Sequence, residues 1–439
     1  MIRSFWEKEF NTRLNGLVKK IDISPVLIGF NANIDAIKYV TPKFVQHLPK
    51  NKDEETHIND VGDLGRGLRQ SIKTGKAEEW EVTEDEPYKK ILSFPYDERR
   101  IGGQAGIVSR LFATLGIENV FLVQQLSKDL ADRIKDKHTR SPIVKNNAFK
   151  LVSPHNAYQT DALTKTNCIF EFKKGMLGAP RANRFIVSYR PKELKPYLDE
   201  HVEAHIADIV KNSTRAFFSG YSWIKYESRK KDFTIARRQI RKMKRANKAL
   251  KIHLEFTNIE EAWLRKMTLN YIAKSVHSLG MNEVESILIL ESLGKKKQAR
   301  HVQDSLFSAQ SLYDALLTIK KALNLERVHV HNSGYYLCVF DKTYNTPERV
   351  LLAHENASLI TGAKAKLGVL KAKKDLLTIR DARIAQQGIT ALGEVDCNQG
   401  IREEKHHYLI GVPNKVPSKV ASTVGLGDTV SSISFVTDQ

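Results

Sequence analysis

Residues 106–126 read GIVSRLFATLGIENVFLVQQL, and this stretch decides the fold class. Gly106–Gly116 reads as a helix, and Asn119–Leu126 reads as the short apolar strand that follows it. Another short apolar run, PVLIGF, stands upstream at Pro25–Phe30 and also reads as a strand. One βα unit therefore leads into the next, which predicts an α/β domain with a largely parallel sheet flanked by helices.

Four later runs carry the same strand signal, with helical segments between them. They are RAFFSGY at Arg215–Tyr221, KIHLEF at Lys251–Phe256, SVHSLG at Ser275–Gly280 and RVHVHNSG at Arg327–Gly334. The α/β domain therefore dominates the second half of the chain.

Two regions interrupt this rhythm. Lys38–Arg99 is rich in charge, and Asn167–Arg190 holds two strand-like runs, CIFEFKKG and RFIVSYRP, that can pair across a turn. We interpret both as parts of a smaller, β-rich lid that packs against the large domain around a cleft. The predicted division assigns residues 1–37, 100–150 and 205–439 to the large domain, and residues 38–99 and 151–204 to the lid.

Composition narrows the class of protein. The 439 residues include no apolar run of about 18 residues, and the N-terminal stretch MIRSFWEKEFNTRLNG is too charged for a signal peptide. We therefore expect a cytoplasmic protein with no membrane partner. Cys168, Cys338 and Cys397 lie far apart without CxxC spacing, which argues against both a disulfide framework and a Cys-rich zinc site.

The formal charge of +20 raises the hypothesis of a nucleic-acid-binding protein. The segment that best supports it, Ala236–Lys251, places apolar side chains along one stripe at helical spacing, with Arg and Lys around the rest. A solvated surface helix explains this pattern better than a nucleic-acid site does. A basic surface would also attract anionic sugar phosphates and nucleotides.

Near the C-terminus the sequence STVGLGDTVSSIS, residues 422–434, places two glycines beside an aspartate just before a segment that can open a helix. Gly425 and Gly427 can make room for an anion, and Asp428 can accept a proton. The alternative is a plain loop with a helix cap, since Asp and Thr both cap helices well.

Two segments near the first strand carry groups suited to hydroxyl-rich ligands. In GFNANID, Asn33 and Asp35 point to one side of an extended chain, and an amide with a carboxylate suits adjacent sugar hydroxyls. In RIGGQAGIVSR, Gly103 and Gln104 stand at the start of a helix, where a ligand can approach the backbone. An Asx turn and a Gly-rich turn are the alternatives. The second segment is neither a Walker A loop nor a dinucleotide fingerprint.

Two further segments place carboxylates where Mg²⁺ could be held. In KIHLEF, His253 and Glu255 share one face of a strand, so the carboxylate at its carboxyl end could bind Mg²⁺ directly or through water. In GMNEVES, Asn282 and Glu285 lie on one face of a first helical turn. They could hold water on a metal, or they could form an ordinary capping box.

The remaining polar segments offer weaker signals. In VHVHNSGYYLCVF, the alternating His329 and His331 favour structural or nucleotide-contacting roles over zinc, because no third ligand follows at a suitable spacing. The lid runs carry Lys174, Arg184 and Arg190, which are either solvated or, if they face a cleft, a clamp for phosphate.

Taken in order, these segments resemble the ADP-dependent sugar kinases of archaea, members of the ribokinase-like superfamily. The most specific motifs are HLE, NEVE and GLGD, and the resemblance runs from about Val26 to the C-terminal end. Within that family, GFNANIDAIKYV, IGGQAGI and HNSGYYL look most like the bifunctional ADP-dependent phosphofructokinase/glucokinase of methanogens.

The resemblance implies roles for the candidate residues. Asp428 would be the catalytic base, and the backbone N–H groups of Gly425 to Asp428, with Gly427 between them, would form the anion hole. Glu255 and Glu285, with Asn282 and His253 nearby, would organise Mg²⁺ mostly through water. The resemblance also implies that sugar hydroxyls are held by Asn33, Asp35, Gly103 and Gln104. It implies that the nucleotide is bound by His331, Asn332, Gly334, Val424 and Gly425.

The lid would recognise the acceptor. In TGKAEEWEV the resemblance puts Glu79 on the hydroxyls of glucose, with Glu78 as a one-residue alternative. Arg190, Lys174 and Arg184, in declining order, are the candidates for a sugar phosphate.

The implied reaction moves the β-phosphoryl group of ADP to fructose 6-phosphate and/or glucose and releases AMP, as a step of glycolysis. The expected partners are these small molecules and Mg²⁺, the expected state is a monomer, and no nucleic acid is expected. Two alternatives stay open: an ATP-dependent sugar or nucleoside kinase of the same superfamily, and a basic nucleic-acid-binding protein.

Overall fold

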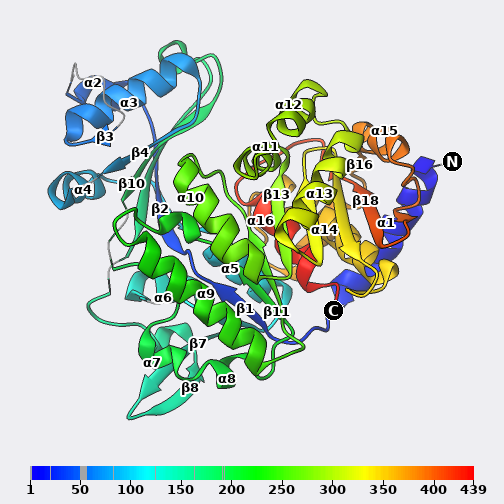
Figure 1. Cartoon of the computed structure of the whole chain (residues 1–439). Helices are drawn as coiled ribbons and strands as arrows, with labels where there is room; N and C mark the ends of the chain where they lie inside the picture. The colour runs from blue at the N-terminus through cyan, green and yellow to red at the C-terminus, as the bar shows by residue number, and fades with distance from the viewer. Residues whose placement is uncertain are drawn as a thin grey trace.

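Two β-sheets organise the chain in the computed structural model (Figure 1), which describes residues 2–19, 21–49, 57–82, 84–123, 125–162, 164–189, 191 and 193–439. The larger sheet has eleven strands and the smaller has six. In spatial order the larger sheet contains β17 (Ile401–Glu403), β18 (His407–Pro413), β15 (Tyr335–Asp341), β14 (Arg327–His331), β13 (Ser278–Asn282), β12 (Lys251–Glu255), β11 (Arg215–Phe218), β1 (Val26–Gly29), β6 (Asn119–Phe121), β7 (Thr139–Lys145) and β8 (Ala148–Val152).

The centre of the larger sheet is parallel. All neighbours from β14 through β7 pair in parallel, while β15, β18, β17 and β8 add antiparallel edges. Strands such as β1 and β11 are buried along their whole length, as expected where both faces of a parallel sheet are covered. The predicted α/β domain with a mostly parallel sheet is therefore confirmed.

The predicted strands have different limits in the structure, and β11 and β14 each end three residues earlier than predicted, at Phe218 and His331. β6 ends at Phe121 instead of Leu126, close to the point where its partner β1 also ends. β13 begins at Ser278 instead of Ser275, because Ala273–Ser275 forms a 3-10 turn.

Helices flank the larger sheet. Among them, α16 packs against both α5 and α14, and it also lies against the central strands β11 to β14. The helices of this part are α1 (Ile2–Lys19), α5 (Gln104–Leu115), α6 (Lys128–Ile134), α7 (Glu200–Glu203), α8 (Ile206–Val210), α9 (Arg229–Ala246), α10 (Ala262–Met267), α11 (Glu283–Ser292), α12 (Lys296–Asp304), α13 (Ala309–Leu323), α14 (Pro347–Leu367), α15 (Gln386–Glu394) and α16 (Leu426–Val436). Short elements are η1 (Pro154–Asn156), η3 (Tyr221–Trp223), η4 (Thr268–Ile272), η5 (Ala273–Ser275), η6 (Lys373–Ile379), β16 (Arg383–Ile384) and β19 (Lys415–Val416).

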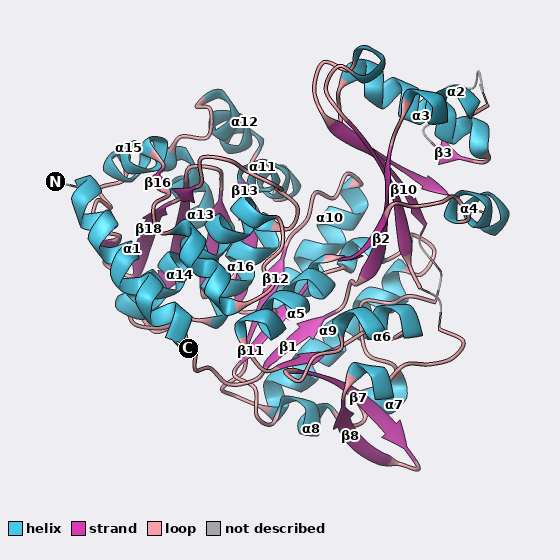
Figure 2. Cartoon of the chain, turned by 180° about the vertical axis from the view of Figure 1, so that it is seen from behind, coloured by secondary structure: helices cyan, strands magenta, loops and turns pink. Residues whose placement is uncertain are grey.

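The smaller sheet stands beside the larger one and carries its own helices (Figure 2). It has a separate hydrophobic core around Trp80, Phe170 and Phe185. The two runs predicted to pair across a turn do so, as β9 and β10. Its elements are β3 (His57–Ile58), β4 (Glu78–Val82), β10 (Asn183–Tyr189), β9 (Thr166–Phe172), β2 (Asn33–Tyr39), β5 (Glu98–Gly102), α2 (Pro42–His47), α3 (Val61–Thr74), α4 (Asp85–Leu92) and η2 (Met176–Gly178).

The chain changes sheets at slightly different places from those in the predicted division. Residues 33–37, assigned by prediction to the large domain, lie in β2 of the smaller sheet. Tyr197 and Leu198, assigned to the lid, are buried in the core of the larger sheet. The chain thus enters the smaller sheet almost directly after β1, which places the end of β1 at the junction of the two sheets.

The basic segment around Ala236 forms α9, and its burial agrees with a surface helix. Ala236, Ile240 and Met243 are buried on one side. On the exposed side, Arg238 and Lys242 both form ion pairs with Glu203, at 2.6 and 2.5 Å. The predicted amphipathic surface helix is confirmed. Within the described part of the chain, we find no helix with the length and hydrophobicity needed to span a bilayer.

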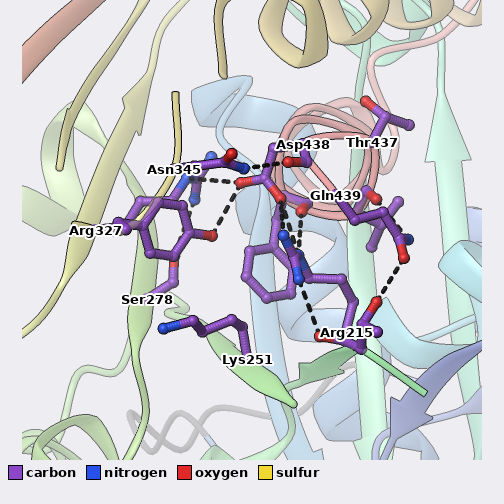
Figure 3. Close-up of polar contacts among 12 residues, drawn as sticks. Arg215, Lys251, Ser278, Arg327, Asn345, Thr437, Asp438 and Gln439 are labelled. Carbon is purple, nitrogen blue, oxygen red and sulfur yellow. Dashed lines mark hydrogen bonds and ion pairs between the residues drawn. The ribbon is translucent and has the colours of Figure 1, made fainter. Parts of the chain in front are cut away.

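A buried polar network fixes the C-terminal end of α16 (Figure 3). Asp438 is fully buried, and its Oδ1 accepts hydrogen bonds from Nε and NH2 of Arg215, at 2.9 and 2.7 Å. The hydroxyl of Tyr344 donates to Oδ2 of Asp438 at 2.9 Å, and the side-chain amide of Asn345 donates to the backbone carbonyl of Asp438. Because Arg215 belongs to β11, this network holds α16 against the centre of the sheet.

Candidate active site

The candidate site lies where the carboxyl ends of β1, β12, β13 and β14 meet the N-termini of α5, α11 and α16. In open α/β sheets, ligands bind outside the carboxyl ends of the strands. The N-terminus of a helix adds unpaired backbone N–H groups and a partial positive charge. All the predicted catalytic and metal-organising residues fall at this edge of the larger sheet.

The first turn of α16 presents the GLGD motif. Gly425 is the N-cap residue in the left-handed conformation, with φ 65°, which a residue with a side chain rarely adopts. Gly427 leaves room for a neighbour, because a Cβ there would lie 2.7 Å from Nε2 of His331. Asp428 lies in the first helical turn and makes no cap hydrogen bond, so the alternative of a simple helix cap is wrong for this residue.

Asp428 has the environment of a proton acceptor. Burial raises the pKa of its carboxyl above the ordinary value of 3.8, while Lys364 and a hydrogen bond from Gln104 lower it. A raised pKa lies closer to the operating pH, as an efficient general base requires. The residue is only partly exposed, at the surface where α16 begins.

Glu255 and Glu285 lie close to Asp428. Glu255 is 4% exposed, and its pKa is raised well above 4.5 by burial and by the carboxylates of Glu285 and Asp428. Burial likewise raises the pKa of Glu285 to about 8. Three crowded carboxyl groups with raised pKa values favour a cation among them. Within the described ranges, no three His, Cys, Asp or Glu residues are grouped closely enough to ligate a metal directly.

Neighbouring side chains fix both glutamates. His253, on the same strand face as Glu255 as predicted, lies with Nε2 3.2 Å from Oε2 of Glu255. Asn282 and Glu285 form a reciprocal capping box, with 2.8 Å between each side-chain oxygen and the other residue's backbone nitrogen. The capping-box alternative is therefore confirmed, and it uses one carboxylate oxygen, Oε2, of Glu285.

The predicted sugar-binding residues gather at the start of β2. Asn33 and Asp35 share one side of the strand, because Nδ2 of Asn33 donates to Oδ1 of Asp35 at 2.7 Å. Asn167 of the neighbouring strand β9 donates to the same oxygen at 3.3 Å. Burial raises the pKa of Asp35, and Asn33, Lys165, Asn167 and Arg184 lower it. The strand geometry rules out the Asx-turn alternative.

Gln104 connects this polar cluster to the first turn of α16. Gly103 is the N-cap residue of α5 and Gln104 is its first residue. Oε1 of Gln104 accepts a hydrogen bond from Asn31 at 3.4 Å, and the Gln104 side chain lies close enough to Asp428 to lower the pKa of its carboxyl. The two ligand-binding regions predicted from separate motifs are therefore adjacent.

The four lid candidates differ in position. Arg184 lies close enough to Asp35 to lower its pKa, and its buried Nε has no hydrogen-bond partner among the described residues. Glu79 is exposed on β4. The register across β4, β10, β9 and β2 places it on the same face of the sheet as Asp35. Lys174 lies in the exposed turn at the far end of β9, so the structure does not bring it to the cluster. Arg190 lies outside the described residues.

Of the predicted nucleotide-binding residues, His331 lies beside α16 and Val424 and Gly425 lead into this helix, while Asn332 and Gly334 lie in the turn after β14. Burial lowers the pKa of His331 to about 4, so its ring is neutral at pH 7. Asn332 shapes the following turn, because its Oδ1 accepts from the backbone nitrogens of Gly334 and Tyr335 at 2.8 and 2.9 Å. Val424 is exposed in the loop that precedes α16.

Sequence reasoning missed three residues of this site. Lys165 is buried with its ammonium 4.5 Å from the ring centre of Trp223, and it lowers the pKa of Asp35. Lys364 of α14 contacts the first turn of α16. Gly280 of β13 lies so close to Glu255 that a Cβ there would be 2.2 Å from Oε2. No motif marks these positions, because their neighbours are distant in the sequence.

Comparison with known proteins identifies the family. Residues 24–437 match the conserved region of ADP-specific Phosphofructokinase/Glucokinase. The chain belongs to this family. The resemblance to ADP-dependent sugar kinases indicated by HLE, NEVE and GLGD is thus confirmed.

Full-length relatives of this family have related activities. An ADP-dependent glucose/glucosamine kinase of Pyrococcus furiosus is 28% identical and aligns over 98% of each chain. An ADP-specific phosphofructokinase of Methanosarcina acetivorans is 30% identical, over 94% of this chain and 92% of that protein. A solved ADP-dependent kinase in complex with fructose 6-phosphate and ADPβS is 32% identical, with a TM-score of 0.86, over 99% of this chain and 97% of that one.

Proposed function

We propose that the chain transfers the β-phosphoryl group of ADP to fructose 6-phosphate and/or glucose, with AMP as the second product. Gln104 carries this proposal, because it lies close enough to Asp428 to lower the pKa of that carboxyl and it accepts a hydrogen bond from Asn31, beside the polar cluster of Asn33 and Asp35. An acceptor hydroxyl held by that cluster would lie next to the carboxylate that takes its proton. Family membership favours ADP over ATP as the donor.

In the proposed reaction, Asp428 accepts the proton of the acceptor hydroxyl as its oxygen attacks the β-phosphorus. A new oxygen–phosphorus bond forms, and the bond between the β-phosphorus and the oxygen that leaves with AMP breaks. The backbone N–H groups at Gly425 to Asp428 stabilise the charge that develops on the transferred group. This use of a helix N-terminus requires the left-handed Gly425 at the start of α16.

The proposed cofactor is Mg²⁺, and the donor set fits it. Mg²⁺ prefers oxygen ligands and usually keeps several waters, which agrees with carboxylates that are too few for direct ligation. Glu255 and Glu285 would hold it through water. When bound, Mg²⁺ supplies positive charge to the phosphates. His253 orients Glu255 for this role, and the capping box orients Glu285.

Gly280→Ala tests the role of Glu255. The new Cβ would lie 2.2 Å from Oε2 of Glu255 and 2.8 Å from Nε2 of His253, so the carboxylate must move. We expect the Mg²⁺ concentration for half-maximal activity to rise about 10- to 100-fold, as for other changes in the surroundings of a metal site. Gly16→Ala on α1 is the control, because a Cβ there meets no atom within 4 Å. Overlapping Mg²⁺ titrations of Gly280→Ala and the parent would contradict the assignment.

The choice of acceptor tests the sugar-binding part of the proposal. Glu79 is proposed to bind glucose hydroxyls, and Arg184 to bind the phosphate of fructose 6-phosphate. We expect Glu79→Ala to raise KM for glucose about 10- to 100-fold, the usual cost of a lost charged hydrogen bond, with little change for fructose 6-phosphate. Arg184→Ala should have the opposite effect.

Both variants and the parent are measured with each sugar, and AMP formation is followed. Parallel losses in the two variants would contradict the sorting of acceptors by the lid. Absence of AMP formation by the parent with either sugar would contradict the proposed function itself.

A further inference from the structure

Lys364 lies beneath the proposed anion hole. This α14 residue is 8% exposed. Its Nζ donates hydrogen bonds to the backbone carbonyl of Gly425 at 2.8 Å and to Oγ1 of Thr429 at 3.0 Å. The hydroxyl of Thr429 also donates to the same carbonyl at 2.8 Å. The ammonium therefore binds the first turn of α16 from the side of the protein interior.

The burial of this charge requires an explanation. Within the described part of the chain, no carboxylate lies within 4.0 Å of Nζ of Lys364 to form an ion pair. Burial lowers the pKa of Lys364 to about 8, while Asp428 raises it, so the side chain is mostly charged at pH 7. A buried ammonium is costly without an opposite charge. A transferred phosphoryl group at the first turn of α16 would supply such a charge.

We propose that Lys364 is a positioning residue that holds Gly425 in its left-handed conformation and places a fixed positive charge behind the anion hole. This inference rests on the proposed function. The bond to the Gly425 carbonyl orients the peptide groups that begin α16, so their N–H groups face the ligand. The charge also stabilises the ionised form of Asp428, which the reaction needs.

The other polar groups around Asp428 supply no positive charge. Glu255 from β12 and Glu285 from α11 lie near Asp428, since each experiences its charge. His331 from β14 is neutral at pH 7. Gln104 from α5 contributes a hydrogen bond but no charge. Lys364 is therefore the positive group in this set, and its loss leaves Asp428 facing two carboxyl groups.

Lys364→Met is the principal test, with Lys366→Met as the matched control. Lys366 lies on the same helix but is exposed and donates to the carbonyl of Thr378 at 2.6 Å. We expect Lys364→Met to lower kcat about 10- to 100-fold, somewhat less than the loss of a direct oxyanion donor. KM for the sugar should stay within about twofold, because Lys364 does not touch the sugar-binding cluster.

The pH profile separates this role from a merely structural one. Loss of the positive charge raises the pKa of Asp428, so activity should disappear at a higher pH on acidification. We expect the acid limb of kcat/KM to move up by roughly one pH unit in Lys364→Met, and not in Lys366→Met. A rate loss that is equal at every pH would contradict the electrostatic part of the inference.

Chemical rescue tests Lys364 in a second variant, Lys364→Ala. Methylammonium can replace both the charge and the N–H donors, whereas tetramethylammonium carries the charge without a donor. We expect saturable rescue by methylammonium alone, and rescue by neither ion would overturn the proposal. If Lys364→Met keeps the parent's rate and pH profile while Asp428→Asn is inactive, the Lys364 inference fails and the proposed function stands. If Asp428→Asn is fully active, the proposed function fails first.

Discussion

Asp428→Asn is expected to lower kcat about 10²- to 10⁴-fold, the range that general base catalysis supplies. The amide keeps the shape of the side chain, but it cannot accept the proton. Affinity for ADP should change little, because the backbone N–H groups at the start of α16 remain in place. The measurements are steady-state kinetics with both sugars and calorimetric titration with ADP.

The control is Asp304→Asn, which changes an exposed aspartate at the end of α12. It should match the parent in both measurements. An Asp428→Asn variant within about threefold of the parent's kcat would remove Asp428 from the base role, because that loss is far below the range for a general base. Since burial raises the pKa of Asp428, the parent's activity should fall on acidification at a pH above the ordinary carboxyl value of 3.8.

Asp438→Ala is expected to destabilise the large domain by about 3–5 kcal/mol, the usual cost of removing one partner from a buried ion pair. Arg215 would keep its buried charge but lose both bonds to Oδ1, and Tyr344 would lose its acceptor. The measurement is urea unfolding followed by tryptophan fluorescence. Asp304→Ala serves as the exposed control.

A double variant tests the reason for this loss. Arg215→Met with Asp438→Ala removes both charges of this pair, while buried Arg327, whose Nε lies 4.0 Å from Oδ2 of Asp438, keeps its charge. We expect the double variant to be less destabilised than the sum of the single variants, because Arg215 no longer leaves an unpaired charge. Additive losses would mean that Arg215 and Asp438 stabilise the protein independently. Such additivity would contradict the view of this pair as the coupled anchor of α16.

Local patterns in the sequence predicted much of the fold. The alternation of strand and helix around Gly106–Leu126 predicted the parallel centre of the large sheet, because a buried parallel strand is apolar along its whole length. The side-by-side placement of His253 and Glu255 also followed from the period of a strand. These features depend on neighbours in sequence, so one chain is enough to reveal them.

Contacts between distant segments could not be predicted in this way. Lys364 lies 2.8 Å from the carbonyl of Gly425, yet its helix carries no motif that marks it as part of a site. The sequence analysis placed Lys174 ahead of Arg184 as a candidate for the sugar phosphate, but the antiparallel turn carries Lys174 to the far end of β9. Which of these basic side chains faces a cleft depends on strand direction and register, and both follow from tertiary packing.

The nature of the phosphoryl donor is the central claim, and it can be measured directly. The purified protein is given ADP and ATP at equal concentrations with excess Mg²⁺ and fructose 6-phosphate, then glucose, and the nucleotides are quantified over time. We predict that ADP is consumed and AMP appears in proportion to the phosphorylated sugar, while ATP stays constant. Consumption of ATP with matching accumulation of ADP, and no AMP, would contradict the account.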